Sequence, residues 1–360
     1  MVYYIVYRDI TGKQVKRTVG SVKKAAEREL AEALRKVERG EYQAAKAVTF
    51  NEFALLWLKE KERSTAKATH KFYKNHVERH LIPFFGTAKL RHINPDFVSE
   101  YIDGKEGISA RTTGYHLTTL RMIFKEAAKR GHIHTNPAVY VSKPRAEYKE
   151  MRILLPFEVE AFLQKVNTYY YPLFLTGLMT GMRQGELFAL TWDDVNIERK
   201  FIHVRKSCSL GEIKEPKSKS SIRVIDVSDG LAEALQYWKL VCPDSKTGLV
   251  FPNSRGNVLN HANILSRVFY PALSEAKIAR VRFHDLRHTH AAYLIAQGEH
   301  IEYIKRRMGH SSVRVTLDLY GHLMPDVGNL AAAKLEEDIF KKMLPPRYQD
   351  FFFDKEKKHD

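Results

Sequence analysis

Hydrophobic residues recur with two different spacings along this chain of 360 residues, and each change of spacing marks a new segment. Residues 2–7 and 14–19 are short runs rich in β-branched and aromatic residues around a D-x-T-G sequence, a pattern that predicts a β-hairpin. Residues 21–40 follow with the periodicity of an amphipathic helix. Residues 1–45 are therefore expected to form a small N-terminal domain, too short to bury a large core.

The next segment, residues 49–147, has apolar residues at i, i+3 and i+4 almost throughout, which predicts a bundle of helices. Local signals mark the helix ends: Asn94 is a suitable N-cap with Pro95 in the first turn, and Gly131 is a stop. The charged, proline-containing stretch 142–150 is the best candidate for a linker between domains.

From residue 152 to residue 340 the pattern is mixed. A helix opens at Pro156, and two β-branched runs, residues 201–207 and 221–227, predict strands joined by a polar connection. Further helices are predicted over residues 230–241, 261–275, 284–297 and 301–308. The predicted fold is thus multidomain and mainly α-helical with small β elements: a hairpin with a helix, a helical bundle, and a mixed α+β domain. Residues 341–360 form a C-terminal tail.

The charge balance adds a partner to this picture. The chain carries 59 Lys and Arg against 42 Asp and Glu, a formal net charge of +17. Such an excess favours a polyanionic partner, and nucleic acid is the commonest one. Two cysteines, Cys208 and Cys242, are too few for a disulfide framework, and no apolar run has the length of a membrane span or a signal peptide. We therefore expect a cytoplasmic protein that binds nucleic acid and no membrane.

Three short stretches of the mixed segment carry reactive side chains at helical spacing. In chain order these are Arg183 and Glu186 in TGMRQGELFAL, His284, Arg287 and His288 in FHDLRHTHAAYLIAQG, and His310 and Tyr320 in MGHSSVRVTLDLYGH. Arg183 and Glu186 are expected on one helical face, and the neighbouring Gly181 and Gly185 leave room for other groups to approach. A single Arg–Glu pair of this kind is a weak signal, because such pairs are common on helix surfaces.

The histidine-rich stretch raises the question of a metal. His284 and His288 have the i, i+4 spacing of a zinc-binding helix, but Asp285 stands where a zinc protease has its glutamate, and no third ligand is obvious. Arginines beside the histidines would repel a divalent cation, whereas a guanidinium group binds a phosphate through two parallel hydrogen bonds. The composition of the site therefore favours a phosphate, stabilised without a metal or another cofactor.

Five motifs in order, GMRQGE, PKSKSSIR, HDLRHTHA, MGHSS and TLDLYGH, make the chain resemble the tyrosine recombinase family, in particular the integrases of phages and integrative elements. The resemblance implies that Arg183 and Arg287 hold the nonbridging oxygens of the scissile phosphate. It implies that His310 donates a further hydrogen bond on the phosphate side and that Glu186 is a supporting carboxylate.

The same resemblance implies the groups that move protons and attack the phosphate. Tyr320 is expected to be the nucleophile that forms a 3′-phosphotyrosine bond, and His284 its general base or acid. Lys217 is expected to protonate the departing 5′-oxygen, with Lys214 and Lys219 as rivals in the same connection. No family role falls to His288 or His290, and packing of the helix is the expected role of both.

For the whole chain, the resemblance implies a site-specific recombinase that acts as a homotetramer on double-stranded attachment sites. Residues 1–45 would bind arm-type sites, and the segments 49–147 and 152–340 would close around core sites. An excisionase and a host DNA-bending protein are further expected partners. The alternatives are a type IB topoisomerase and a DNA-binding protein without catalytic activity. For the tail, residues 341–360, docking on a neighbouring protomer, packing on its own domain and disorder all remain open.

Overall fold

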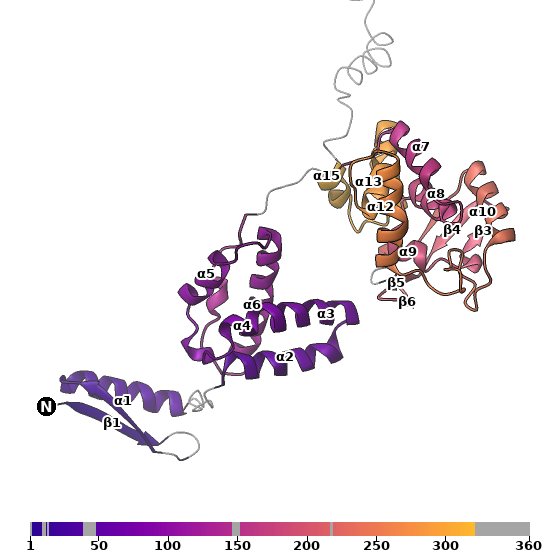
Figure 1. Cartoon of the computed structure of the whole chain (residues 1–360). Helices are drawn as coiled ribbons and strands as arrows, with labels where there is room; N and C mark the ends of the chain where they lie inside the picture. The colour runs from indigo at the N-terminus through magenta and orange to yellow at the C-terminus, as the bar shows by residue number, and fades with distance from the viewer. Residues whose placement is uncertain are drawn as a thin grey trace, which may run out of the picture. The chain divides into compact units, whose positions relative to one another are not determined.

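The computed structural model describes residues 2–8, 12, 14–38, 48–145, 152–216 and 219–320 (Figure 1). The chain folds as two compact units, Met1–Lys149 and Glu150–Asp360. Several sequence predictions fall outside the described residues: most of the D-x-T-G turn, the helix stop at Gly40, the end of the 142–150 linker, Lys217 and the tail.

The N-terminal segment is a hairpin followed by a helix, as predicted. Strands β1 (Tyr3–Arg8) and β2 (Gln14–Gly20) pair antiparallel, and α1 (Lys23–Glu38) packs on them. Alternate residues of β1, Ile5 and Tyr7, are buried against the helix. The core is small because one face of a short hairpin can bury few side chains.

Residues 48–145 form a helical bundle around an aromatic core that includes Phe50, Trp57, Phe85 and Phe124. The predicted cap is present, since the Asn94 side chain accepts a hydrogen bond from the backbone N–H of Phe97. The helices are α2 (Phe50–Ser64), α3 (Lys67–His76), the π-helical turn η1 (Val77–Leu81), α4 (Ile82–Phe85), η2 (Leu90–His92), α5 (Pro95–Asp103), α6 (Ala110–Lys129) and η3 (Pro137–Val139).

The second unit has a mainly helical core with two small sheets. Strands β3 (Val195–Asn196), β4 (Phe201–Val204) and β7 (Arg223–Asp226) form one antiparallel sheet with β7 at its edge. The connection between the two predicted strands contains a second hairpin, β5 (Ser207–Ser209) with β6 (Glu212–Lys214), which the sequence analysis did not predict. Its strands are three residues long, too short to show a periodicity.

The helices of this unit agree with the predicted segments. One difference is that the helix predicted over residues 261–275 contains a π-helical stretch, η6 (Leu265–Phe269). The other helices are α7 (Pro156–Lys165), α8 (Tyr171–Thr180), α9 (Gln184–Phe188), η4 (Trp192–Asp194), η5 (Lys219–Ser221), α10 (Asp229–Val241), α11 (His261–Ile264), α12 (Tyr270–Glu275), α13 (Phe283–Ala296), α14 (Ile301–Met308) and α15 (Val313–Tyr320).

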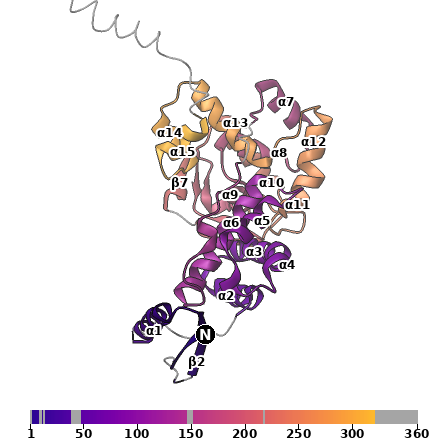
Figure 2. The ribbon, with the colours of Figure 1, turned by 90° about the vertical axis from the view of Figure 1, so that its left-hand side faces the viewer.

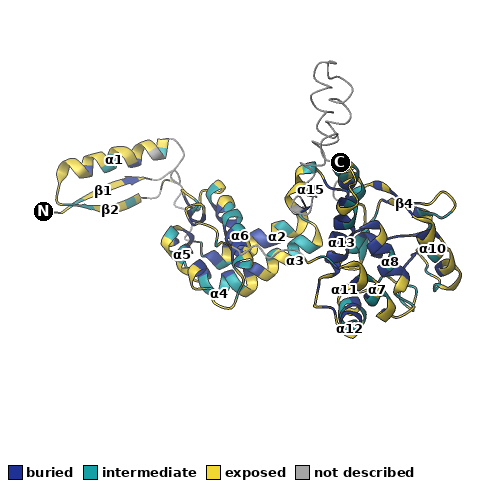
Figure 3. Ribbon diagram, turned by 90° about the horizontal axis from the view of Figure 1, so that it is seen from above, coloured by how far each residue is buried: buried dark blue, intermediate teal, exposed yellow. Residues whose placement is uncertain are grey.

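Helix α13 lies at the centre of this unit. It packs against α8 and α14, and nearly all of its side chains are buried, in contrast to α10, which exposes one face (Figure 3). Helices α13, α14 and α15 lie together beside β7 (Figure 2). A helix buried on most of its circumference holds its polar side chains in fixed positions, so the polar residues of α13 are candidates for a preorganised site.

Candidate active site

Glu186 lies between two arginines. Arg183 is the N-cap of α9 rather than a residue of its helical face, so the expected pairing on one face is replaced by capping: the Arg183 backbone N–H donates to a Glu186 carboxylate oxygen at 2.9 Å. The Arg183 side chain also donates from Nη1 to Glu186 Oε1 at 2.8 Å. From the other side, Arg223 of β7 donates to both carboxylate oxygens at 3.1 and 2.9 Å.

The two ion pairs keep Glu186 charged inside the protein. Burial would raise the pKa of Glu186, but the hydrogen bonds and charge of Arg223 and the charge of Arg183 outweigh burial and hold the pKa below its ordinary value. Arg223 and Glu186 have side chains that are each 3% exposed, so the pair is isolated from water. A carboxylate shared in this way fixes the position of Arg183.

Arg287 of α13 is held by backbone carbonyls. Its Nη1 donates to the carbonyl oxygen of Gly181 at 2.7 Å and its Nη2 to that of Met308. Arg183 donates from Nη2 to the carbonyl of the next residue, Gly309, at 3.1 Å. Both guanidinium groups therefore converge on the end of α14, although they come from distant parts of the chain.

Two glycines allow this close packing, as the sequence predicted. Gly181 has a φ of +64°, and a Cβ there would lie 2.6 Å from the ring of His290. A Cβ on Gly185 would lie 2.6 Å from the carbonyl oxygen of Cys208 in β5. Any side chain at these positions would displace α13 or the β5–β6 hairpin from the site.

Tyr320, at the C-terminal end of α15, is fully buried in its own chain. Its ring packs with apolar side chains of α13 and α14, and its hydroxyl oxygen lies 2.7 Å from Nδ1 of His288. Burial raises the pKa of Tyr320 to about 12, although the positive charges of Arg287 and Arg183 lower it. The phenol is therefore protonated at neutral pH and sits within the field of both arginines.

The two other histidines of the predicted site lie next to these groups. His310 is buried, and its Nδ1 forms a hydrogen bond of 2.9 Å with Thr316 Oγ1. Burial and the charges of nearby arginines lower the pKa of His310 to about 3. The ring of His284 keeps an exposed surface and contacts the ring of His288, with centroids 4.8 Å apart. Partial burial and the charge of Arg287 lower the pKa of His284 to about 4.

The structure brings together six of the seven predicted site residues and adds two. Arg223 was not among the predicted site residues, and His288, which was expected only to pack, is buried and also forms a hydrogen bond with the Tyr320 hydroxyl. His290 does pack, because it bonds the Leu178 carbonyl and accepts from Arg307. The sequence shows that His288 directly follows Arg287 in the motif. It does not show that His288 contacts Tyr320, which is 32 positions away.

The lysine position remains a prediction. Lys217 and the side chain of Lys219 lie outside the described residues. Lys214, the other rival, forms an ion pair of 2.7 Å with Glu212 of the same strand, β6. Lys214 ends strand β6, and Lys217 and Lys219 come after it in the sequence. Strand β5, which pairs with β6, lies against Gly185.

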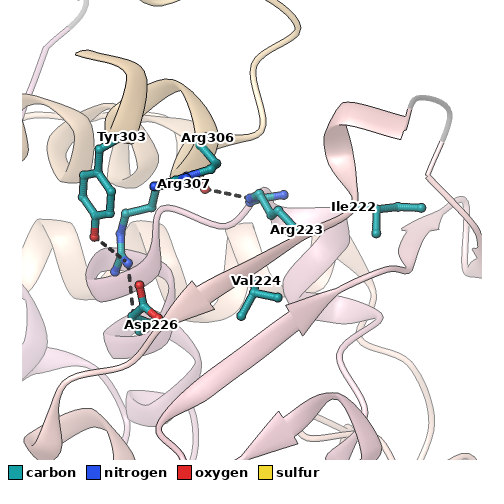
Figure 4. A pocket seen from close by; sticks show the side chains of 7 residues that line it. All are labelled: Ile222, Arg223, Val224, Asp226, Tyr303, Arg306 and Arg307. Carbon is teal, nitrogen blue, oxygen red and sulfur yellow. Dashed lines mark hydrogen bonds between the residues drawn. The ribbon is translucent and has the colours of Figure 1, made fainter. Parts of the chain in front are cut away.

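A hollow of about 430 Å³ lies beside the site (Figure 4). Arg223 links the two, since it binds Glu186 and donates from Nε to the Arg307 carbonyl at 2.7 Å. Arg307 in turn donates to the carbonyl of Asp226 at 3.1 Å and to the hydroxyl of Tyr303 at 3.3 Å. The hollow is lined by Ile222, Arg223, Val224, Asp226, Tyr303, Arg306 and Arg307.

Within residues 2–320, apart from the gaps given above, no group of three or more His, Cys, Asp or Glu side chains is placed to hold a metal ion. No helix in the same ranges is both long enough and apolar enough to cross a membrane.

Comparisons with known proteins support a family assignment for both units. Residues 152–326 match the phage integrase family, and residues 49–143 match the phage integrase SAM-like domain. The chain is 28% identical over 349 residues to the ICEBs1 integrase of Bacillus subtilis (strain 168), covering 91% of this chain and 94% of that protein. It is 26% identical over 371 residues to a tyrosine recombinase XerC-like protein of Caldanaerobacter subterraneus subsp. tengcongensis, covering 92% and 94%.

Solved structures share the fold. The Tn1549 transposon integrase in complex with circular intermediate DNA superposes with a TM-score of 0.69 at 20% identity, covering 80% of this chain and 100% of that one. The lambda integrase tetramer bound to a Holliday junction superposes with a TM-score of 0.61 at 20% identity, covering 86% and 95%.

Tyr320 lies beside His288 and His310 and within the field of Arg183 and Arg287, in an α+β unit that follows a helical bundle, and this arrangement is typical of a tyrosine-dependent enzyme of phosphoryl transfer. The chain belongs to the phage integrase family and is a tyrosine-type site-specific DNA recombinase.

Proposed function

We propose that Tyr320 attacks a phosphodiester of an attachment site and forms a 3′-phosphotyrosine bond, so that the chain integrates or excises a mobile element. The observation that carries this proposal is that the buried phenol of Tyr320 lies within the field of two positive charges, those of Arg287 and Arg183. The covalent bond keeps the energy of the broken phosphodiester, so rejoining needs no nucleotide. The free 5′-hydroxyl of another strand then reverses the step.

Arg183 and Arg287 would hold the two nonbridging oxygens of the scissile phosphate. In the transition state these oxygens carry the growing negative charge, and preorganised donors stabilise it without reorganisation. Glu186 and the Gly181 and Met308 carbonyls support this role, because they fix the two guanidinium groups before DNA arrives. His310 would add a neutral hydrogen-bond donor from the start of the next helix.

The departing 5′-oxygen needs a proton, and we assign this role to Lys217. A lysine in the connection that follows the β5–β6 hairpin is close in sequence to the strand packed on Gly185. Lys214 is a weaker choice, because its ammonium group is paired with Glu212. The resemblance assigns the general base or acid of the nucleophile to His284, whose ring is exposed on α13 and contacts His288, the residue bonded to the Tyr320 hydroxyl.

The division of labour along the chain follows from charge and domain order. Residues 1–45 would bind arm-type sites, while the bundle (49–147) and the catalytic segment (152–340) would hold the core site. The net charge of +17 supports binding of a DNA duplex by phosphate contacts. We further propose a homotetramer on two duplexes in the bacterial cytoplasm, assisted by an excisionase and a host bending protein. The lambda integrase, which shares the fold, has been solved as a tetramer bound to a Holliday junction, and this supports the tetramer.

A nicked suicide substrate tests this function. The wild-type protein should form a covalent adduct confined to one DNA sequence, and Tyr320→Phe should form none while it binds DNA with nearly the same affinity. Adducts on any supercoiled or unrelated DNA would instead indicate a topoisomerase, and sequence-specific binding without an adduct a non-catalytic DNA-binding protein. The reaction should persist in excess EDTA, since the arginines supply the positive charge that a metal ion supplies elsewhere.

A further inference from the structure

The hydroxyl of Tyr320 has a defined hydrogen-bond partner that the family resemblance did not assign. Nδ1 of His288 lies 2.7 Å from the phenolic oxygen, a short hydrogen-bond distance, and both residues are buried. The ring of Tyr320 is fixed by a small apolar cluster that includes Ile304 and Met308. The oxygen is therefore held on His288 by packing on one side and by the hydrogen bond on the other.

The other polar groups of the site are engaged elsewhere. The two Nη atoms of Arg287 donate to backbone carbonyls, and Nδ1 of His310 is bonded to Thr316. The ring of His310 stacks parallel to that of Tyr320, with centroids 6.4 Å apart. The ring of His284 lies edge-on against His288. His288 thus stands between His284 and the phenol.

The surroundings of His288 keep its ring neutral. Burial and the neighbouring His284, Arg282 and Arg287 lower the pKa of His288 to about 4, and Asp285 opposes them. A neutral imidazole with its proton on Nε2 presents a free lone pair at Nδ1, toward the phenol. In the free protein, the raised pKa of Tyr320 and the lowered pKa of His288 both keep the proton on the phenol, so the nucleophile is not activated without DNA.

We propose that His288 is the general base of the cleavage step, on the premise that Tyr320 is the nucleophile of the proposed function. As Tyr320 Oη forms its bond to phosphorus, the phenolic proton passes to Nδ1 of His288. The bond from phosphorus to the 5′-oxygen breaks, and that oxygen takes a proton from the lysine of the connection. During rejoining, a 5′-hydroxyl forms a bond to phosphorus and gives its proton to the same lysine, while the phosphotyrosine bond breaks and the His288 imidazolium returns its proton to Tyr320. The phosphate on Arg287 offsets the positive charge that disfavours this imidazolium.

The test is the pH dependence of single-turnover cleavage on a nicked suicide substrate. In the wild-type protein, cleavage should be nearly independent of pH between about pH 6.5 and 9, because an internal base takes the proton. His288→Asn keeps an oxygen acceptor near the place of Nδ1 but accepts no proton. Its cleavage should be about 10²–10³-fold slower at neutral pH and should rise about tenfold per pH unit, because hydroxide must then remove the proton. DNA binding should not change.

The matched control is His284→Asn, which alters the neighbouring histidine of the same helix. It should slow cleavage without producing the steep pH dependence. A substrate with sulfur in place of the scissile 5′-oxygen has a leaving group that needs no proton, so it should not rescue His288→Asn. The proposal is overturned if His284→Asn, and not His288→Asn, shows the steep profile, or if the sulfur substrate rescues His288→Asn.

Two further measurements separate the possible failures. His288→Gln repeats the test with a longer side chain if His288→Asn does not fold, as judged by circular dichroism. The wild-type profile is decisive without any variant, because a tenfold rise per pH unit through neutral pH would show that no protein group takes the proton. If the wild-type protein forms no covalent adduct, the proposed function itself fails, which is a different outcome from an adduct that forms independently of His288.

Discussion

At the scale of single residues, the site depends on charged groups that would be costly to bury alone. Glu186 is the clearest case, because its carboxylate is buried and each of its oxygens accepts from an arginine. Breaking such a pair leaves an uncompensated charge, whereas replacing both partners by apolar residues is often neutral. We therefore expect Arg223 to act on the reaction through Glu186 and Arg183, as a positioning residue.

We predict that Arg223→Met destabilises the protein by about 3 kcal/mol in urea unfolding of the intact chain, because Glu186 loses its buried partner. Adding Glu186→Leu should recover most of the stability but not cleavage, since Arg183 then has no carboxylate to orient it. Arg314→Gln removes a pair whose side chains are 88% and 69% exposed and should change stability by less than about 1 kcal/mol. Equal effects of the two arginine changes would contradict this account.

At the scale of elements, the helical bundle contains a group of three histidines, of which His76 and His116 are buried and His80 is half-buried. The ring of His116, on α6, lies 4.7 Å from that of His76 and 4.5 Å from that of His80. Nδ1 of His116 is bonded to the Tyr101 hydroxyl at 3.0 Å, and Nδ1 of His76 to Thr119 Oγ1 at 3.1 Å. The three rings join α3 and η1 to α6 while they remain neutral.

We predict that acid weakens the bundle. Burial and the neighbouring histidines lower the pKa of His116 to about 4, and burial lowers the pKa of His76 and of His80. The unfolded chain, with histidine pKa values near 6.5, binds more protons than the folded one below that pH. The neutral rings should make their full contribution to the free energy of unfolding above about pH 6.5, and this contribution should decrease as the pH falls toward 4.

Hydrogen exchange of α6 amides at pH 7 and pH 5, corrected for intrinsic rates, measures this effect. Protection should be lower at pH 5, and His116→Phe, which cannot be protonated, should reduce the difference between the two pH values. Protection of α6 that is the same at both pH values in the wild-type protein would show that the histidines do not govern the stability of the bundle.

At the scale of the whole molecule, the reactive residues and the N-terminal hairpin belong to different compact units. Every site residue lies between Arg183 and Tyr320, whereas residues 1–45 offer basic side chains on a small fold. Phosphate contacts of that kind add affinity and make it steeply dependent on salt without adding chemistry.

Deletion of residues 1–45 should therefore leave cleavage of a short core-site suicide substrate intact and impair recombination on a full attachment site. The logarithm of the affinity for arm-containing DNA should also fall less steeply with the logarithm of salt concentration. Loss of core-site cleavage in a truncated protein that is still folded would place the N-terminal unit in the core-binding clamp and refute this division of labour.

Features that depend on neighbouring residues could be predicted from the sequence. Helix periodicity and caps such as Asn94 act within one or two turns, so most helices could be predicted, and motif order identified Arg183, Arg287 and Tyr320. The β5–β6 hairpin could not be predicted, because its strands of three residues are stabilised by pairing with each other and by packing on Gly185.

Which side chains meet depends on how distant segments pack. The partners of Arg223 and His288 lie 37 and 32 positions away, at Glu186 and Tyr320, and no local pattern specifies a contact at such a distance. Burial then set the chemistry of those contacts, because removal from water makes a lone carboxylate costly, a phenol harder to ionise and an imidazole neutral. The sequence thus determined which reactive groups are present, and packing around α13 decided which of them act on one another.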